Sequence, residues 1–453
     1  MDENQNEGPD PLASRPESPS SIPLLLTDDD CPLPAATQRW NICCFAGIWC
    51  LYYLAAPVSY IGITHANLLK SLGQTTIAAN LPSALYLATS VFPVLIAWFL
   101  PHPKLLTPLL VAALSVEASA TAALAALLWL RPPSEFVSAG VIAHGAIFGA
   151  AGGVVLTTMW ELVRRGVSTS RRGYALGLSF GIGPLLACVG SLGQLALFSK
   201  ITIGRFSFGH PYPFPTNYLL LFVAAVPILL GCSALAASFV VPRATQEPSG
   251  AFGLAEITGG LRQFFTYRPL VFGAVAYLLV YSGGNAIMQN ASIYAKVVLE
   301  SGTDTQGIQQ FLRFGCKAVT GACLGWLLAK TNPKAALLAT TSILLLAMTW
   351  TLNSHGWWYL ASFGIFGSGE LFGAYFPNYV ATASAKSRVR LNIAYLSLLG
   401  SLVGVASYLY GWIADKFGLV ASFHAAAGVL VLAMGWIIVA LPTRPVPIAT
   451  SEE

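Results

Sequence analysis

Residues 105–130 read LLTPLLVAALSVEASATAALAALLWL, and Glu117 is the only charged residue among them. A helix needs about 20 mostly apolar residues to cross a bilayer, so this stretch is predicted to be a transmembrane helix. The rest of the 453-residue chain has the same character, because 55% of its residues are apolar and only 9% are charged. A soluble protein carries roughly 25% charged residues. The composition therefore excludes a soluble enzyme, a nucleic-acid binder and a disordered scaffold.

Apolar stretches of this length recur twelve times along the chain. We expect spans at about residues 40–63, 76–100, 105–130, 135–160, 173–198 and 217–241, and at 268–291, 308–330, 335–353, 357–382, 391–414 and 419–441. The longest cytoplasmic link between spans covers residues 242–267 and divides them six and six. The sequence thus predicts an all-α membrane protein with an N-terminal bundle at 39–241 and a C-terminal bundle at 268–441.

The two ends of the chain are polar. Residues 1–38 are rich in Pro, Ser, Asp and Glu, which predicts a disordered tail, and residues 442–453 form a shorter polar tail. Lys and Arg are enriched in cytoplasmic loops. If both termini are cytoplasmic, 16 of the 24 basic residues fall on the cytoplasmic side and 6 outside. We therefore expect a multi-pass protein of the cell membrane with both termini in the cytoplasm.

Loop motifs accompany this 6+6 plan. Residues 171–174, after the fourth span, read RRGY; residues 325–334 read GWLLAKTNPK, and residues 411–418 read GWIADKFG. The second of these keeps the Gly and both basic positions of Gly-x3-Asp-Arg/Lys-x-Gly-x-Arg/Lys, and the third is a fuller match. Over residues 39–441 the chain resembles the major facilitator superfamily. The resemblance implies two pseudo-symmetric six-helix bundles. In this arrangement the first, fourth, seventh and tenth helices line a central cavity, the eighth also borders it, and the third and twelfth lie outside it.

Three ionisable residues lie in spans that the resemblance places at the cavity. Arg313 and Lys317 stand four residues apart in the eighth span, and Glu370 lies near the middle of the tenth. An ionisable residue inside a bilayer costs on the order of 2.5–3.5 kcal/mol of free energy. Each of these residues is therefore expected to have a partner or a function. We predict that Arg313 and Lys317 bind an anionic substrate, with Glu370 as counter-ion and proton carrier. The alternative is that Arg313 snorkels to the outer surface and Lys317 and Glu370 form only a structural pair.

The seventh span carries a polar and aromatic stripe. Tyr277, Tyr281, Asn285 and Gln289 follow one another at four-residue spacing, with two glycines between them that weaken the helix. We predict Tyr281, Asn285 and Gln289 as substrate contacts, since the resemblance places this helix at the cavity. Hydrogen bonding between helices is the open alternative.

Other polar positions add weaker candidates. Trp49, Tyr53 and Tyr60 fall on one face of the first span within about 40°, and aromatic rings with a polar group suit a substrate cavity. Packing is the alternative for this stripe. Tyr53 and, in the tenth span, Asn378 are the candidate substrate contacts.

Two more ionisable residues are candidates for proton coupling. His144 in the fourth span is of a type that titrates near physiological pH, although a hydrogen-bonded packing role is the alternative. Glu117 lies in the third span, which the resemblance places outside the cavity. It becomes a leading proton carrier only if it faces the cavity.

Glycine is frequent in the tenth span, at Gly364, Gly367, Gly369 and Gly373. Small residues let helix backbones approach closely and slide. A rocking motion and tight packing alone both explain these glycines.

The motifs that are missing narrow the function. The sequence has no P-loop, no zincin or nucleophile-elbow motif and no Cys/His metal pattern. No cofactor or metal is expected, and neither ATP-driven transport nor an enzyme is predicted.

We predict a secondary active transporter, coupled to protons, for a small organic anion. The alternatives are a facilitator or exporter of neutral sugars or amphiphiles, and a receptor that binds a solute without moving it. The expected partners are the solute, the lipid bilayer and protons, with no nucleic acid and a monomeric state.

Overall fold

The computed structural model describes residues 31, 33–92, 103–203, 206–242, 254–299, 304–384 and 389–445. These residues are mostly helical and include one short antiparallel hairpin. Eight of the described helical segments are long and apolar enough to cross a membrane. The chain is therefore a multi-pass membrane protein, as its composition predicts. Most of the predicted N-terminal tail, residues 243–253 of the predicted linker and residues 446–453 lie outside the described residues.

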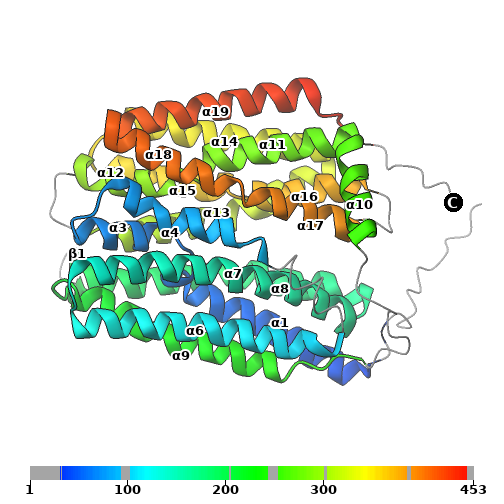
Figure 1. Cartoon of the computed structure of the whole chain (residues 1–453), viewed down its shortest axis with the longest axis horizontal. Helices are drawn as coiled ribbons and strands as arrows, with labels where there is room; N and C mark the ends of the chain where they lie inside the picture. The colour runs from blue at the N-terminus through cyan, green and yellow to red at the C-terminus, as the bar shows by residue number, and fades with distance from the viewer. Residues whose placement is uncertain are drawn as a thin grey trace, which may run out of the picture.

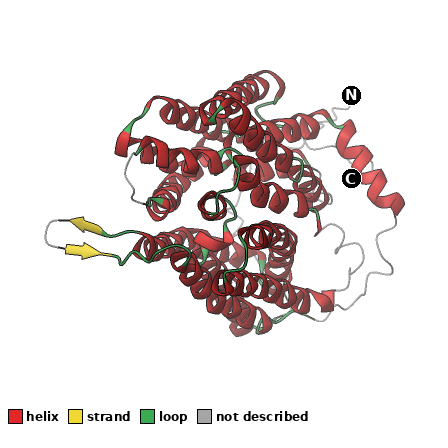
Figure 2. Cartoon of the chain, turned by 60° about the vertical axis from the view of Figure 1, so that its left-hand side comes forward, coloured by secondary structure: helices red, strands yellow, loops and turns green. Residues whose placement is uncertain are grey.

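The first half consists of helices with one hairpin. Its elements are α1 (Ala35–Leu54), α2 (Ala56–Ser59), α3 (Ile63–Ser71), α4 (Thr76–Thr89), the 3-10 helix η2 (Pro103–Leu105), α6 (Leu106–Leu130), α7 (Ser134–Gly166), α8 (Thr169–Phe198), β1 (Ile201–Ile203), β2 (Phe206–Phe208) and α9 (Thr216–Ala237). Figure 2 shows the β1–β2 hairpin projecting from the helical body.

The described part of the second half contains helices only. They are α10 (Leu254–Thr266), α11 (Arg268–Gly284), α12 (Met288–Val298), α13 (Gln306–Lys330), α14 (Pro333–Asn353), the 3-10 helix η3 (Gly356–Leu360), α15 (Ala361–Gly369), α16 (Phe372–Ala383), α17 (Val389–Gly400), α18 (Val403–Phe417) and α19 (Leu419–Ala440). Two predicted boundaries need correction. Helix α1 begins inside the predicted tail, and α10 occupies half of the predicted linker.

Four predicted spans are interrupted rather than continuous. The first breaks at residues 60–62 and runs on as α3, the seventh at 285–287, the tenth at 370–371 and the eleventh at 401–402. The seventh breaks directly after two glycines, and α12 carries it beyond its predicted end. Interrupted helices in membranes are tolerated where protein surrounds the freed backbone groups or where they line a polar cavity. The breaks therefore mark places to look for a site.

The long helices run between two ends of the molecule (Figure 1). One end, called the hairpin end here, carries the β-hairpin, α3 and α12. The other, the terminal end, carries the start of α1, the end of α19 and α10. The first and last helices therefore start and finish at the same end.

Each half has its own hydrophobic core. One large cluster of buried side chains lies within residues 42–239 apart from Ile293, and another lies within residues 264–441 apart from Ile63 and Leu87. The three exceptions belong to helices that meet across the halves, because α12 packs on α3 and α4 packs on α18. Helices α8 and α13 form a second contact between the halves. Arg313 and Lys317 lie on α13 and Gln289 on α12, so these three candidate residues belong to helices that form the contacts.

Candidate functional site

Arg313, Lys317 and Glu370 form one ion-paired cluster between α13 and the break that separates α15 from α16. The Arg313 Nε donates to Glu370 Oε1 at 2.7 Å, and its Nη2 lies 2.6 Å from the same oxygen. The Lys317 Nζ contacts Glu370 Oε2 at 3.3 Å. Arg313 is 7% exposed and Glu370 8%, whereas the Lys317 side chain is 17% exposed. The structure thus brings these three predicted residues together, with two cations against one carboxylate.

Aromatic rings cover the cationic side of this cluster. The Arg313 guanidinium carbon lies 5.8 Å from the centre of the Tyr60 ring, and the Lys317 Nζ lies 6.0 Å from it. Tyr53 stacks on Tyr60 with 5.8 Å between ring centres, and Phe314 meets Tyr60 edge-on. Tyr60 is at the break between α2 and α3, so the interrupted first span supplies the ring. Tyr53 is buried and supports Tyr60 from behind.

The polar stripe predicted on the seventh span is divided by the break. Tyr281 remains beside the cluster, where its ring meets that of Phe372, two residues after Glu370, with 5.2 Å between ring centres. Asn285 is partly exposed at the start of the break, and its side chain forms no hydrogen bond with the described residues. Asn378 of α16 is also partly exposed, and its side chain also forms no hydrogen bond with the described residues. The substrate contacts of these residues stay predictions.

Gln289 lies beyond the break at residues 285–287, in α12 at the hairpin end. Its amide donates to Ser83 of α4 at 2.5 Å, and it is 2% exposed. Gln289 therefore bridges the two halves of the molecule. Its contact with substrate is untested.

The first half holds a second set of buried ionisable groups. The sequence neighbours of His144 are small residues and indicate an isolated ring. In the structure, its Nδ1 lies 3.0 Å from the Nε2 of His65, and its Nε2 lies 3.2 Å from Thr121 Oγ1. His65 was missed, since it precedes His144 by 79 positions and no spacing connects them. Both rings are at least 98% buried.

Glu117 faces the interior of the first half rather than its outer surface. Its side chain is fully buried, and Tyr52 of α1 donates its hydroxyl to Oε1 at 3.2 Å. The same oxygen lies 3.2 Å from where a Cβ would stand on Gly152 of α7. From the third span, Glu117 therefore packs against the first and fourth spans. Proton transfer through Glu117 stays a prediction.

Uncharged hydrogen bonds join the halves near the hairpin end. Asn67 of α3 donates to Ser292 of α12 at 2.7 Å, and Asn80 of α4 donates to Asn290 of α12 at 2.8 Å. These partners are more than 200 positions apart in the chain, so the sequence does not reveal them. They connect the two halves at this end of the molecule.

A carboxylate adds a charged bond to the same interface. Asp415, from the motif at residues 411–418, accepts from the backbone N–H of Thr76 at 2.8 Å and from that of Ile77 at 2.7 Å. These are the first two residues of α4, where unpaired N–H groups and the helix dipole favour a negative charge. The motif thus bridges α18 of one half to α4 of the other.

Replacing Asp415 with Ala is expected to favour opening of the hairpin end by about 1–2 kcal/mol, the usual value of a carboxylate cap. The distance between spin labels on Lys70 of α3 and Lys296 of α12 measures this opening. Lys416→Ala is the control, because Lys416 packs over the Trp412 and Phe417 rings of its own helix. Unchanged label distances in Asp415→Ala would contradict the bridging role.

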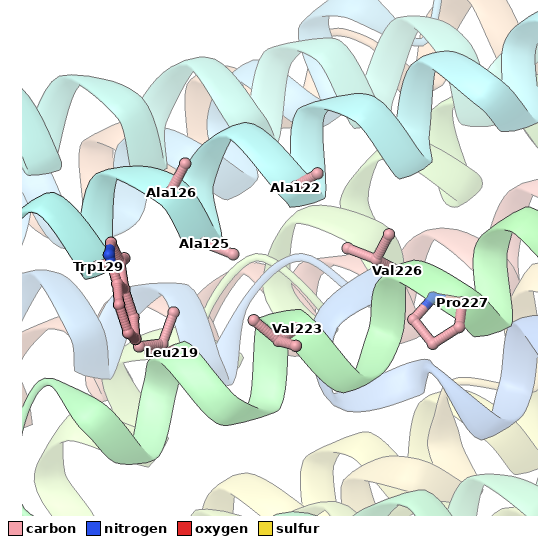
Figure 3. Close-up of a pocket in the computed structure, with 8 residues that line it drawn as sticks. All are labelled: Ala122, Ala125, Ala126, Trp129, Leu219, Val223, Val226 and Pro227. Atoms are coloured by element: carbon pink, nitrogen blue, oxygen red, sulfur yellow. The ribbon is translucent and has the colours of Figure 1, made fainter.

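The described surface also has an apolar groove between α6 and α9 (Figure 3). Its volume is about 550 Å³, and it is lined by Ala122, Ala125, Ala126, Trp129, Leu219, Val223, Val226 and Pro227. Trp129 is 72% exposed there. None of the candidate residues reaches the groove, and its lining offers no charge or amide to select a polar solute. It is suited to contact with lipid chains.

Solved structures share this fold. A bacterial homologue of the human lysosomal transporter Spinster, in an inward-facing and unoccupied conformation, gives a TM-score of 0.64 at 10% identity, covering 90% of this chain and 98% of that one. A D-xylose-proton symporter gives 0.64 at 14% identity, covering 90% and 99%. The major facilitator superfamily transporter FucP, in an outward conformation, gives 0.58 at 15% identity, covering 89% and 100%. No family model matches the sequence, and no curated protein matches it.

Proposed function

We propose, starting from the major facilitator superfamily fold that this chain has, that it is a secondary active transporter of a small organic anion, coupled to protons. The observation that carries the proposal is the cluster of Arg313, Lys317 and Glu370. Its formal charge of +1 is held among buried side chains, where an unpaired charge is expensive. A bound anion would offset positive charge in the cluster.

The proposed topology is twelve spans in two six-helix bundles, residues 39–241 and 268–441, with both termini in the cytoplasm. Separate hydrophobic cores support the two bundles. In this orientation the hairpin end faces outward, and its bonds between the halves hold the outer end closed. Alternating access would then require the bonds at residues 67, 80 and 415 to break in each transport cycle.

The two cations have different roles in this proposal, because their contacts with Glu370 differ. Arg313 makes two close contacts with one oxygen of Glu370, so it holds the carboxylate in place. Lys317 has a single longer contact, and its side chain is more exposed. Its ammonium group carries three donors, which leaves donors for a carboxylate of the substrate.

A coupling mechanism follows from this arrangement. A proton that binds to Glu370 removes the negative charge opposite both cations and releases Lys317. The substrate anion then takes the place of Glu370 at the ammonium group. When the proton leaves, Glu370 competes again for Lys317 and promotes release of the anion. Anion and proton are therefore bound and released together. The His65–His144 pair and Glu117 are the further candidates for the proton pathway.

Replacement of Lys317 with Ala tests the proposal. We expect uptake of organic anions into proteoliposomes to fall at least roughly tenfold, because a charge-assisted hydrogen bond of about 1.5–3 kcal/mol is lost. Folding should remain largely intact, since Arg313 still neutralises Glu370. Lys296→Ala, at an exposed position of α12, is the matched control. Normal anion uptake in Lys317→Ala would refute the anion site.

A neutral hydroxylated solute is the second candidate. Asn285, Asn378 and Tyr281 offer uncharged hydrogen-bonding groups near the cluster, and one structural neighbour is a D-xylose-proton symporter. Uptake of neutral sugars that is indifferent to Lys317→Ala would favour this candidate over the anion.

A further inference from the structure

Gln310 of α13 is a fully buried amide without a partner. It is 0% exposed, and neither its Oε1 nor its Nε2 forms a hydrogen bond with the described residues. An unpaired buried polar group costs about 1–3 kcal/mol. The adjacent Gln309 shows the contrast, because its amide donates to Thr305 and accepts from Ser292. The empty hydrogen-bonding groups of Gln310 therefore need an explanation.

Five more buried amides have an unpaired oxygen among the described residues: Asn67, Asn80, Gln194, Gln289 and Gln306. Two of them, Gln289 and Gln194, lie against the break in the first span. The Nε2 of Gln289 would lie 3.4 Å from a Cβ on Gly62. The Nε2 of Gln194 donates to Thr64 Oγ1 at 3.2 Å. The Oε1 of each has no partner among the described residues, and both side chains are at least 98% buried.

The charged cluster reaches the same break from the other side, through Tyr60. Gln310 precedes Arg313 by three residues, which is about 4.5 Å along the helix axis. It precedes Lys317 by seven residues, about 10.5 Å along the axis and on the same face. Gln289 and Gln194 thus contact residues 62–64, and the two cations contact Tyr60 at the start of the same break.

We propose that Gln310, Gln289 and Gln194 form a hydroxyl-binding part of the substrate site, for a polyhydroxylated organic anion whose carboxylate binds Lys317. In these three side chains, three of the four unpaired atoms are acceptors, so they require hydrogen-bond donors from the ligand. Hydroxyl groups supply them, whereas an ammonium group would be repelled by Arg313 and Lys317. This inference rests on the anion site of the proposed function.

Three six-carbon probes separate the contributions: gluconate, hexanoate and sorbitol. Their affinities are measured from the thermal stability of the purified protein, since a ligand of the folded state raises its melting temperature. We expect gluconate to bind roughly tenfold more tightly than hexanoate, because its hydroxyl groups satisfy the buried amides. Sorbitol should bind more weakly than gluconate, because it lacks the carboxylate.

Gln310→Leu is the decisive variant, and Gln309→Leu is its matched control on the same helix. Gln310→Leu should weaken gluconate binding roughly tenfold and leave hexanoate binding unchanged. It should also raise the melting temperature without ligand, because an unpaired amide is removed. Gln309→Leu should lower the melting temperature, since it breaks two hydrogen bonds, and keep the preference for gluconate.

The outcomes distinguish this inference from the proposed function. Equal binding of gluconate and hexanoate, with both dependent on Lys317, would overturn the inference and keep the anion site. If Gln310→Leu kept the preference for gluconate and had a lower melting temperature, water rather than a ligand would be the hydrogen-bond partner of the amides. That result would also overturn the inference. Failure of both acids to bind, with no effect of Lys317→Ala, would overturn the proposed function itself. Sorbitol binding as tight as that of gluconate would overturn the anionic part.

Discussion

Glu370→Ala is expected to abolish uptake and to lower the stability of the folded protein by about 3–5 kcal/mol, the usual effect of removing one partner from a buried ion pair. The substitution leaves Arg313 and Lys317 without the carboxylate that both contact. Arg313 is 7% exposed, so water compensates little of its charge. Thermal unfolding of the purified protein measures the loss.

Two companion variants identify the cause. The double variant Glu370→Ala/Lys317→Ala should recover part of the lost stability, because only one cation is then left without a counter-ion. Glu370→Gln imitates the protonated side chain, so it should still bind the anion but fail to accumulate it against a gradient when protons drive uptake.

Glu135→Ala, at an exposed position in the first turn of α7, is the control. A loss below about 1 kcal/mol in Glu370→Ala would show that the two cations do not depend on this carboxylate.

The cluster could be predicted from the sequence because charge in an apolar segment has few ways to be stabilised. Arg313 and Lys317 share a helix face by their spacing, and Glu370 is the acidic residue of a neighbouring apolar segment. The same reasoning did not find His65, the partner of His144, because it lies on another helix 79 positions away. A hydrogen bond between two distant side chains leaves no pattern in composition or spacing. Asp415 shows the same limit, since its partners are backbone N–H groups more than 330 positions away.

The positions of the helix breaks also could not be predicted from the periodicity of the sequence. A continuous helix places Gln289 on one stripe with Tyr281 and Asn285, and the sequence contains two glycines that warn against continuity. Glycine lowers helix stability by roughly 1 kcal/mol but does not fix where the chain turns. The turn is set by tertiary contacts of α12 with α3 and α4. The orientation of every residue after the break therefore depends on packing between the halves.

The glycines of the tenth span can now be separated by what surrounds them. A Cβ on Gly367 would lie 2.0 Å from the carbonyl oxygen of Arg313, and one on Gly364 would lie 2.7 Å from Cys316 Sγ. Nothing lies within 4 Å of a Cβ on Gly373. Close packing of α15 on α13 thus explains Gly364 and Gly367 but not Gly373. The carbonyl is backbone, so it cannot move aside as a flexible side chain would.

Gly367→Ala is expected to destabilise the protein by about 2–3 kcal/mol and to impair uptake as well. Overpacking costs about 1–3 kcal/mol or more, and here it must also exceed the gain of up to about 1 kcal/mol that Ala brings to a helix. Moving α15 away from α13 also draws Glu370, three residues after Gly367, away from Arg313 and Lys317. Thermal unfolding and anion uptake report the two effects.

Gly373→Ala is the matched control, and its sign should be opposite. It lies in the first turn of α16 with open space at the Cβ position, so the helix gains stability without a clash. If Gly367→Ala were as stable as Gly373→Ala, α15 and α13 would have room to separate without cost, and the glycines would serve sliding rather than tight packing. If Gly367→Ala were destabilised but transported normally, the position of Glu370 would not depend on this contact. A joint loss of stability and uptake is the result that ties helix packing to the charged cluster.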